Sequence, residues 1–206
     1  TTTDSLFAFT PSMIYNSAIA GQQYEYPNAM IGYWGSYAAK GFKMNFHETL
    51  IRDTFINASG DNETFYVWAD SDGTEHYFIA DNDGVYRDED GLQLTLTVDT
   101  ENDVCTIIDS AHNERVFVWN LGAIEDKVEK TYYLSYIKDA NGNKLKFLVD
   151  AQRKPQYVRV EPNGMSEINM LNMLYNSSNM IYTVWNTVTG DAILFRHSDT
   201  PNGTLS

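Results

Sequence analysis

The stretch LSYIKDANGNKLKFLVDAQRKPQYVRV (Leu134–Val160) decides how this chain folds. Apolar and polar residues alternate on both sides of Asn141-Gly142, a dipeptide that strongly favours a tight β-hairpin turn. This pattern predicts strand, turn, strand, turn and strand in succession. The rest of the chain repeats the unit with variations, so the unit sets the expected fold class.

Nine residues around that turn recur elsewhere in the chain. DANGNKLKF (Asp139–Phe147) is matched by DSDGTEHYF (Asp70–Phe78), DSAHNERVF (Asp109–Phe117) and TVTGDAILF (Thr187–Phe195). The side chain at the first position can accept hydrogen bonds from N–H groups two residues further on. At the fourth position we predict a positive φ, which glycine adopts freely and His tolerates.

Every copy ends in Phe, which is expected on the buried face of the outgoing strand. The predicted turn residues are Asp70, Gly73, Asp109, His112, Asp139, Gly142 and Gly190, and the predicted core residues are Phe78, Phe117, Phe147 and Phe195. Four hairpins of one design amount to an internal repeat.

This repeat resembles the units of the bacterial Rhs, or YD-repeat, proteins. Their units carry a D-x-x-G-N turn, an alternating strand, then Tyr-Asp and a second glycine turn. The lead-in segment of that family is similar to MIYNS (Met13–Ser17), GFKMNFHETL (Gly41–Leu50) and VWADSDGTEHYF (Val67–Phe78), and DEDGLQLTLTV (Asp88–Val98) fits the same pattern. The likeness covers most of residues 11–160. Its units are degenerate, because Val149-Asp150 stands where Tyr-Asp is usual.

The resemblance implies an all-β fold in which consecutive antiparallel hairpins form a curved repeat sheet, part of a β-shell that can enclose a C-terminal toxin. It implies a non-catalytic structural segment of a large bacterial protein that is secreted or displayed on the cell surface. Its partners would be the rest of its parent chain and any toxin cargo. We expect an aromatic-rich lead-in over 1–64, degenerate repeats over 65–160, and a further hairpin and tail over 161–206, in one continuous domain.

Composition excludes several functional classes. The 206 residues include 14 Lys/Arg and 28 Asp/Glu, giving a formal charge of −14 that repels phosphate backbones, so we expect no nucleic-acid binding. No apolar run is long enough to span a membrane and no signal peptide is apparent. The chain starts Thr-Thr-Thr without Met, which favours a segment of something larger. A single cysteine, Cys105, excludes an internal disulfide framework and is expected to be buried in a strand.

An aromatic cluster near the N-terminus leaves a second function open. If its side chains are exposed, they form a platform for sugars and the protein is a glycan-binding adhesin module; if buried, they cover an open end of the sheet. The platform would consist of Tyr24, Tyr26, Tyr33, Trp34 and Tyr37. A carbohydrate-active enzyme is a third interpretation, since paired carboxylates can act as acid and base.

We predict no catalytic residue, no enzymatic activity and no cofactor. None of the four histidines has an H-E-x-x-H or C-x-x-C partner, and no G-x-S-x-G motif occurs. Most acids lie in turns, where Asp stabilises the local backbone and water keeps a carboxyl pKa low. Calcium is a weaker alternative, because the expected Glu at position twelve of an EF-hand loop is missing. Its candidate ligands are Asp81, Asp83, Asp88 and Asp90.

Two further features stay open in the sequence. Met165–Tyr175 fits either a helix after Ser166 or a loosely alternating strand. The last hairpin, Met180–Phe195, would leave an unpaired strand edge if it ends a sheet. We therefore expect edge-to-edge self-association through this hairpin.

Overall fold

A computed structural model describes residues 9–15, 42–119, 130–150, 155–177 and 180–196. These residues form β-strands and no helix, which confirms the predicted all-β class. No helix with the length and apolar character needed to cross a membrane occurs in this part of the chain. Residue contacts divide the chain into two compact units, 48–142 and 1–47 with 143–206.

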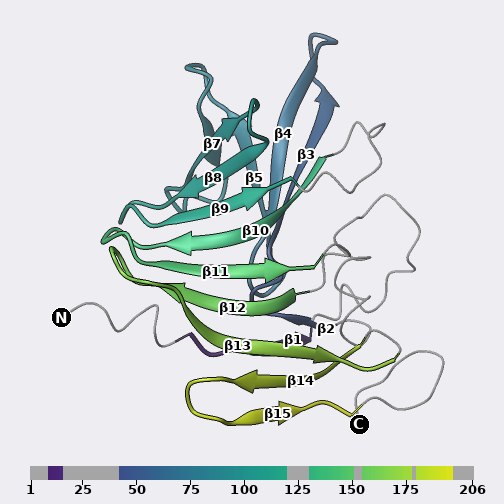
Figure 1. Ribbon diagram of the computed structural model, residues 1–206. Helices are drawn as coiled ribbons and strands as arrows, with labels where there is room; N and C mark the ends of the chain where they lie inside the picture. Colours follow the sequence, from purple (N-terminus) through teal and green to yellow (C-terminus); the bar gives the residue numbers. More distant parts are fainter. Residues whose placement is uncertain (1–8, 16–41, 120–129, 151–154, 178–179, 197–206) are drawn as a thin grey trace. The chain divides into compact units, whose positions relative to one another are not determined.

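Residues 48–142 form a closed, eight-stranded antiparallel barrel (Figure 1). Each strand pairs with the next along the chain, and the last strand also pairs with the first. The strands are β3 (Thr49–Ile56), β4 (Asn62–Ala69), β5 (Glu75–Ala80), β6 (Tyr86–Asp88), β7 (Thr95–Asp99), β8 (Val104–Ile108), β9 (Glu114–Val118) and β10 (Lys130–Lys138).

The closed barrel corrects the prediction of a curved open sheet for this part of the chain. Strand β10 is long enough to serve two neighbours: Lys130–Tyr133 pair with β3, and Tyr133–Lys138 pair with β9. The register with β9 shifts between Leu134 and Tyr136, where a β-bulge bends the strand. This bend lets one strand complete the ring, which removes two free strand edges.

The barrel interior is filled by large apolar side chains. Residues paired across antiparallel strands share a face, and every second residue points inward. The inward residues Phe78 and Phe117 are fully buried at 0% exposure. Other interior residues, each buried, are Leu50, Tyr66, Trp68, Leu96, Cys105, Ile107, Tyr132 and Leu134. An eight-stranded barrel is just wide enough to be filled in this way.

The turns that join these strands share one bonding pattern. In the turn from Asp70 to Thr74, Asp70 Oδ1 accepts from the N–H groups of Asp72 and Thr74, both at 3.0 Å. The backbone closes around it, since Gly73 N–H donates to Asp70 O and Asp70 N–H donates to Thr74 O. Gly73 has a φ of 92°, as the pattern predicts for the fourth position.

The same pattern occurs more often than the sequence repeat indicates. At His112 and Gly142, the fourth residues of two other predicted turns, φ is 63° and 87°. Two turns that the repeat did not include begin at Asn57 and Asp81. Their side-chain oxygens accept the same backbone N–H bonds, and Gly60 and Gly84 occupy the fourth position with positive φ. In five turns, then, an Asp or Asn side chain organises the same backbone loop.

The fourth predicted turn is displaced by one residue. Asn186, and not Thr187, accepts the backbone N–H groups of Val188 and Thr189 through its Oδ1. Gly190 keeps a positive φ of 82° but bonds to the carbonyl of Asn186, four residues back. The loop is therefore longer, and Phe195 falls after the short last strand, half-buried and outside the core that the repeat predicted.

The second unit contains a two-stranded sheet and a five-stranded meander (Figure 1, purple and green to yellow). The small sheet pairs β1 (Met13–Tyr15) with β2 (Phe42–Met44). The meander runs in chain order through β11 (Lys144–Val149), β12 (Pro155–Glu161), β13 (Ile168–Tyr175), β14 (Ile181–Asn186) and β15 (Ala192–Leu194). Strand β13 resolves the ambiguity over Met165–Tyr175 in favour of a strand.

Aromatic stacking forms part of the core of this second unit. Phe147, a predicted core residue on β11, is 8% exposed and stacks on Phe46 with ring centroids 5.6 Å apart. Phe9 makes an edge contact with Phe147, with centroids 5.9 Å apart, and a tilted contact with Phe46, with centroids 6.3 Å apart. The repeat thus places Phe147 correctly, as it does Phe78 and Phe117 in the barrel.

Candidate functional site

A buried ionic cluster occupies one end of the barrel interior. The Glu48 side chain is 4% exposed and accepts a hydrogen bond of 2.9 Å from Trp68 Nε1. Arg115 Nε lies 3.5 Å from the same carboxylate oxygen, and the Arg115 guanidinium lies over the Trp68 ring at 5.2 Å. Glu48 immediately precedes β3, Trp68 lies near the end of β4, and Arg115 lies on β9. A carboxylate at this depth is stabilised by the Trp68 hydrogen bond and by the positive charge of Arg115.

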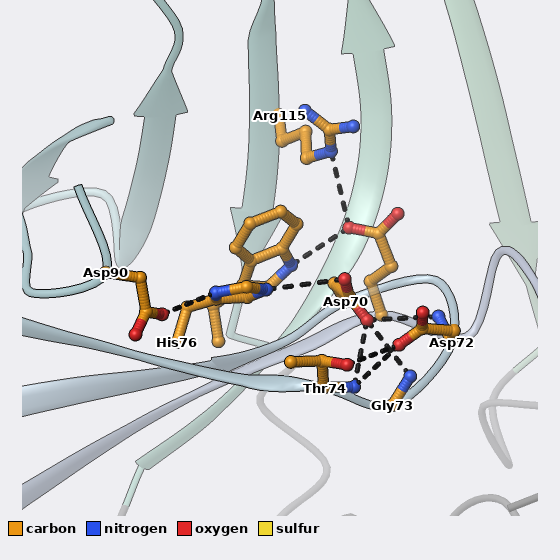
Figure 2. Close-up of polar contacts among 9 residues, drawn as sticks. Asp70, Asp72, Gly73, Thr74, His76, Asp90 and Arg115 are labelled. Atoms are coloured by element: carbon orange, nitrogen blue, oxygen red, sulfur yellow. Dashed lines mark hydrogen bonds and ion pairs between the residues drawn. The ribbon is translucent and has the colours of Figure 1, made fainter. Parts of the chain in front are cut away.

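His76 lies beside this cluster and bridges two loops (Figure 2). Its Nδ1 is 2.8 Å from Asp90 and its Nε2 is 3.3 Å from Asp70, while its ring lies 4.8 Å from that of Trp68. Burial alone would lower the pKa of His76, but its hydrogen bonds to the carboxylates of Asp90 and Asp70, together with their negative charges, outweigh burial and raise that pKa. The His76 ring thereby links the β4–β5 turn to the loop after β6.

This arrangement is suited to holding loops together and not to proton transfer. A general base needs a ring nitrogen that can reach a substrate. Both nitrogens of His76 are engaged by carboxylates, and Asp70 also holds its own turn through Oδ1. The repeat motif places Asp70 and His76 in one turn and strand, but the roles of Glu48, Asp90 and Arg115 depend on strands that are distant in sequence.

A polar cavity of about 440 Å³ lies at the opposite end of the barrel. On β3 the inward position Leu50 separates Glu48 from Arg52, so the cluster and the cavity are separated by the apolar core. The cavity is lined by Arg52, Thr64, Tyr66, Tyr86, Val98, Thr100, Asp103, Lys130 and Tyr132. None of these residues was singled out by the sequence motifs, because their chemistry meets only when the barrel closes.

Tyr66 and Tyr132, two of the residues that line the cavity, are buried. Burial raises the pKa of Tyr66 to about 12, although the Arg52 guanidinium that donates to its hydroxyl opposes this. Burial likewise raises the pKa of the Cys105 thiol to about 12, and it raises the pKa of Tyr132, which hydrogen-bonds that thiol. These groups are therefore neutral hydrogen-bonding partners at physiological pH, and Cys105 is an unreactive buried thiol, as its strand position predicted.

Three of the four calcium candidates, Asp81, Asp88 and Asp90, bond to protein groups through their carboxylates. Asp81 accepts a hydrogen bond of 2.8 Å from Arg87 Nε. This bond, together with those from backbone N–H groups, lowers the pKa of Asp81. Asp88 accepts from the backbone N–H groups of Leu92 and Leu94, and Asp90 is bound to His76. Within the described ranges, no three His, Cys, Asp or Glu side chains gather in a way that could hold a metal ion.

The other predicted site residues are placed as follows. The aromatic platform, residues 24–37, lies outside the described residues. His47 is 1% exposed, accepts the Met44 N–H through Nδ1, and has a pKa lowered to about 3 by burial and by the charge of Lys43. His112 occupies a turn, and His197 also lies outside the described residues. None of the three described histidines, His47, His76 and His112, belongs to the cavity lining given above.

Two observations thus bear on function: a set of turns of one design, and a closed barrel with an ionic cluster at one end and a polar cavity at the other. Comparison of the chain with known protein families and with curated proteins finds no match.

Proposed function

We propose that this chain is a non-catalytic structural segment of a large secreted or surface-displayed protein of the Rhs/YD-repeat type. In this role the chain forms part of the wall of a β-shell that can enclose a C-terminal toxin. The observation that carries the proposal is the turn shared by Asn57, Asp70, Asp81, Asp109 and Asp139. Each turn is stabilised from within its own five residues, so hairpins of this design can follow one another without support from a central core.

The meander of the second unit supports the same role. Within this unit, each strand from β12 to β15 pairs with the one before it, so the meander grows by one strand per hairpin. On β15, Ile193 is 50% exposed and Leu194 is 67% exposed. An apolar strand of this kind is suited to pairing with and being covered by a following strand of the parent chain.

The buried polar groups also favour a structural role over catalysis. Glu48 is neutralised by Arg115 and held by Trp68, and His76 has a carboxylate on each ring nitrogen. A catalytic acid or base must instead present a group to a substrate in a shaped pocket. In this protein the ionic groups at the Glu48 end of the barrel connect strands and turns to one another.

Electron cryomicroscopy of the full-length parent protein tests the architectural role. We expect β15 to pair with a following strand and the five-residue turn to recur along a continuous shell. A parent protein in which β15 borders solvent, with no further hairpins of this type, would refute the proposal.

A substrate screen separates this role from an enzymatic one. We expect no turnover of glycosidase, esterase or peptidase substrates by the purified chain. Turnover that co-purifies with the protein and is abolished by Glu48→Gln or Asp90→Asn, in variants whose circular dichroism is unchanged, would place the protein among enzymes.

A further inference from the structure

We propose that the polar cavity of the barrel binds a small hydroxylated carboxylate, of the size and chemistry of a monosaccharide acid. The cavity lies at the end of the barrel that is remote from the Glu48 cluster, and its volume of about 440 Å³ falls within the usual range of small-ligand sites. Barrels of eight strands can hold one small ligand at such a position. The proposal concerns a binding activity that a wall segment does not require.

The charged side chains that line the cavity, Arg52, Lys130 and Asp103, give it a net charge of about +1, which one bound anion would neutralise. Arg52 on β3 and Lys130 on β10 are direct cross-strand partners, and both side chains line the cavity. Two cations in this position repel each other and destabilise the strand pair. Asp103 neutralises one of them through its ion pair with Lys130. One positive charge, that of Arg52, is left over.

Among the described residues, no carboxylate forms an ion pair with Arg52. The Arg52 guanidinium instead donates a hydrogen bond to the neutral hydroxyl of Tyr66. This is notable in a chain with twice as many acids as bases, since 28 Asp/Glu face 14 Lys/Arg. A planar guanidinium with spare donors is the group that binds a carboxylate in a two-point geometry. Arg52 is therefore the anchor for the acid group of the ligand.

A ligand with a single negative charge fits better than a phosphate. The cavity has one uncompensated cation, whereas a phosphate monoester carries nearly two charges and would leave one of them unpaired. The strongly acidic chain, at −14 overall, also disfavours additional negative charge.

The remaining lining residues can form hydrogen bonds with the hydroxyl groups of the ligand. Thr64 and Thr100 offer hydroxyls that both donate and accept, and Tyr86 offers an aromatic ring and a phenol. Tyr86 is held at a fixed angle by Tyr66, with ring centroids 5.0 Å apart and planes at 84°. Polar groups around one aromatic face suit a polyhydroxylated ring, whose C–H face packs on the aromatic side chain.

The test is calorimetric or NMR titration of the intact chain with D-glucuronate, with D-glucose as the neutral probe. For a ligand of this size we expect a dissociation constant on the order of 1 mM for glucuronate. Glucose, which lacks the carboxylate, should bind at least about tenfold more weakly. Equal affinity for the two sugars, or no binding of glucuronate up to about 50 mM, would overturn the proposal.

Two variants locate the site. Arg52→Gln should weaken glucuronate binding about tenfold or more, whereas the matched control Arg87→Gln, which removes an exposed arginine paired with Asp81, should leave it unchanged. If Arg52→Gln does not fold, Thr64→Val keeps the side-chain shape and should weaken binding severalfold through loss of one hydroxyl. Chemical-shift changes that map away from β3, β4 and β10, or a control variant as weak as Arg52→Gln, would refute this location.

Discussion

Replacing Gly84 by Val isolates the energetic cost of the shared turn. Gly84 has a φ of 76°, and a Cβ added there would meet no atom within 4 Å. The substitution therefore introduces no clash with neighbouring groups, and its cost is that of forcing a β-branched residue into the left-handed region. We expect a loss of about 1–3 kcal/mol in the free energy of unfolding.

Equilibrium unfolding in urea measures this loss. With an m-value of about 2 kcal/mol per molar urea, a cost of 2 kcal/mol lowers the transition midpoint by about 1 M. Gly84→Asn should cost much less, because Asn tolerates positive φ. The matched control is Asp83→Val in the same turn, where the backbone has no positive φ and the change should be within about 0.5 kcal/mol.

The reverse substitution completes the comparison. His112 occupies the same position with a φ of 63°, so His112→Gly should be neutral or stabilising by up to about 1 kcal/mol. The reasoning would be refuted if Gly84→Val unfolded at the wild-type midpoint. It would equally be refuted if His112→Gly were as destabilising as Gly84→Val.

Other expected outcomes concern buried charge and the sheet edge. Glu48→Gln should cost about 1–3 kcal/mol in urea unfolding, because it removes the buried carboxylate charge beside the partly exposed Arg115 guanidinium; a cost below about 0.5 kcal/mol would contradict this. His76 has a raised pKa in the folded state, so its stabilisation is complete below about pH 6.5 and is lost as pH rises through the folded value; in His76→Gln this component of the pH dependence should disappear. His47 has the opposite sign, since its pKa is lowered to about 3: its contribution is present above about pH 6.5 and declines as pH falls towards 3, which His47→Phe should abolish in unfolding curves. Self-association through the last hairpin should appear in sedimentation velocity as a concentration-dependent increase that Ile193→Lys removes, and a monomer at every concentration would contradict it.

The local parts of this fold could be predicted from sequence because their causes are local. Asp70, Asp109 and Asp139 each bond N–H groups within their own turns, and Phe78, Phe117 and Phe147 follow at a fixed distance on the buried face. The prediction failed at Thr187–Phe195, where Asn186 supplies a better acceptor one residue earlier and displaces the loop. A repeated sequence pattern therefore does not by itself produce the same backbone geometry.

The barrel and both of its ends depend on contacts that no short motif contains. Closure pairs Thr49–Arg52 with Lys130–Tyr133, segments that are far apart in the chain. The partnership of Glu48 with Arg115, and the cavity shared by Arg52 and Lys130, arise only after this pairing. Sequence periodicity defines which residues face inward on each strand, but it does not define which strand closes the ring.

Closure by β10 also has a consequence for the order in which the protein folds during synthesis. The hairpins from β3 to β9 join residues that are close in sequence, so they can form on the microsecond timescale as they leave the ribosome. The contact between Lys130–Tyr133 and Thr49–Arg52 must await the emergence of β10 and carries the largest loop entropy. Until that moment the nascent chain exposes the edges of β3 and β9, and this interval is when it is most open to pairing with another chain.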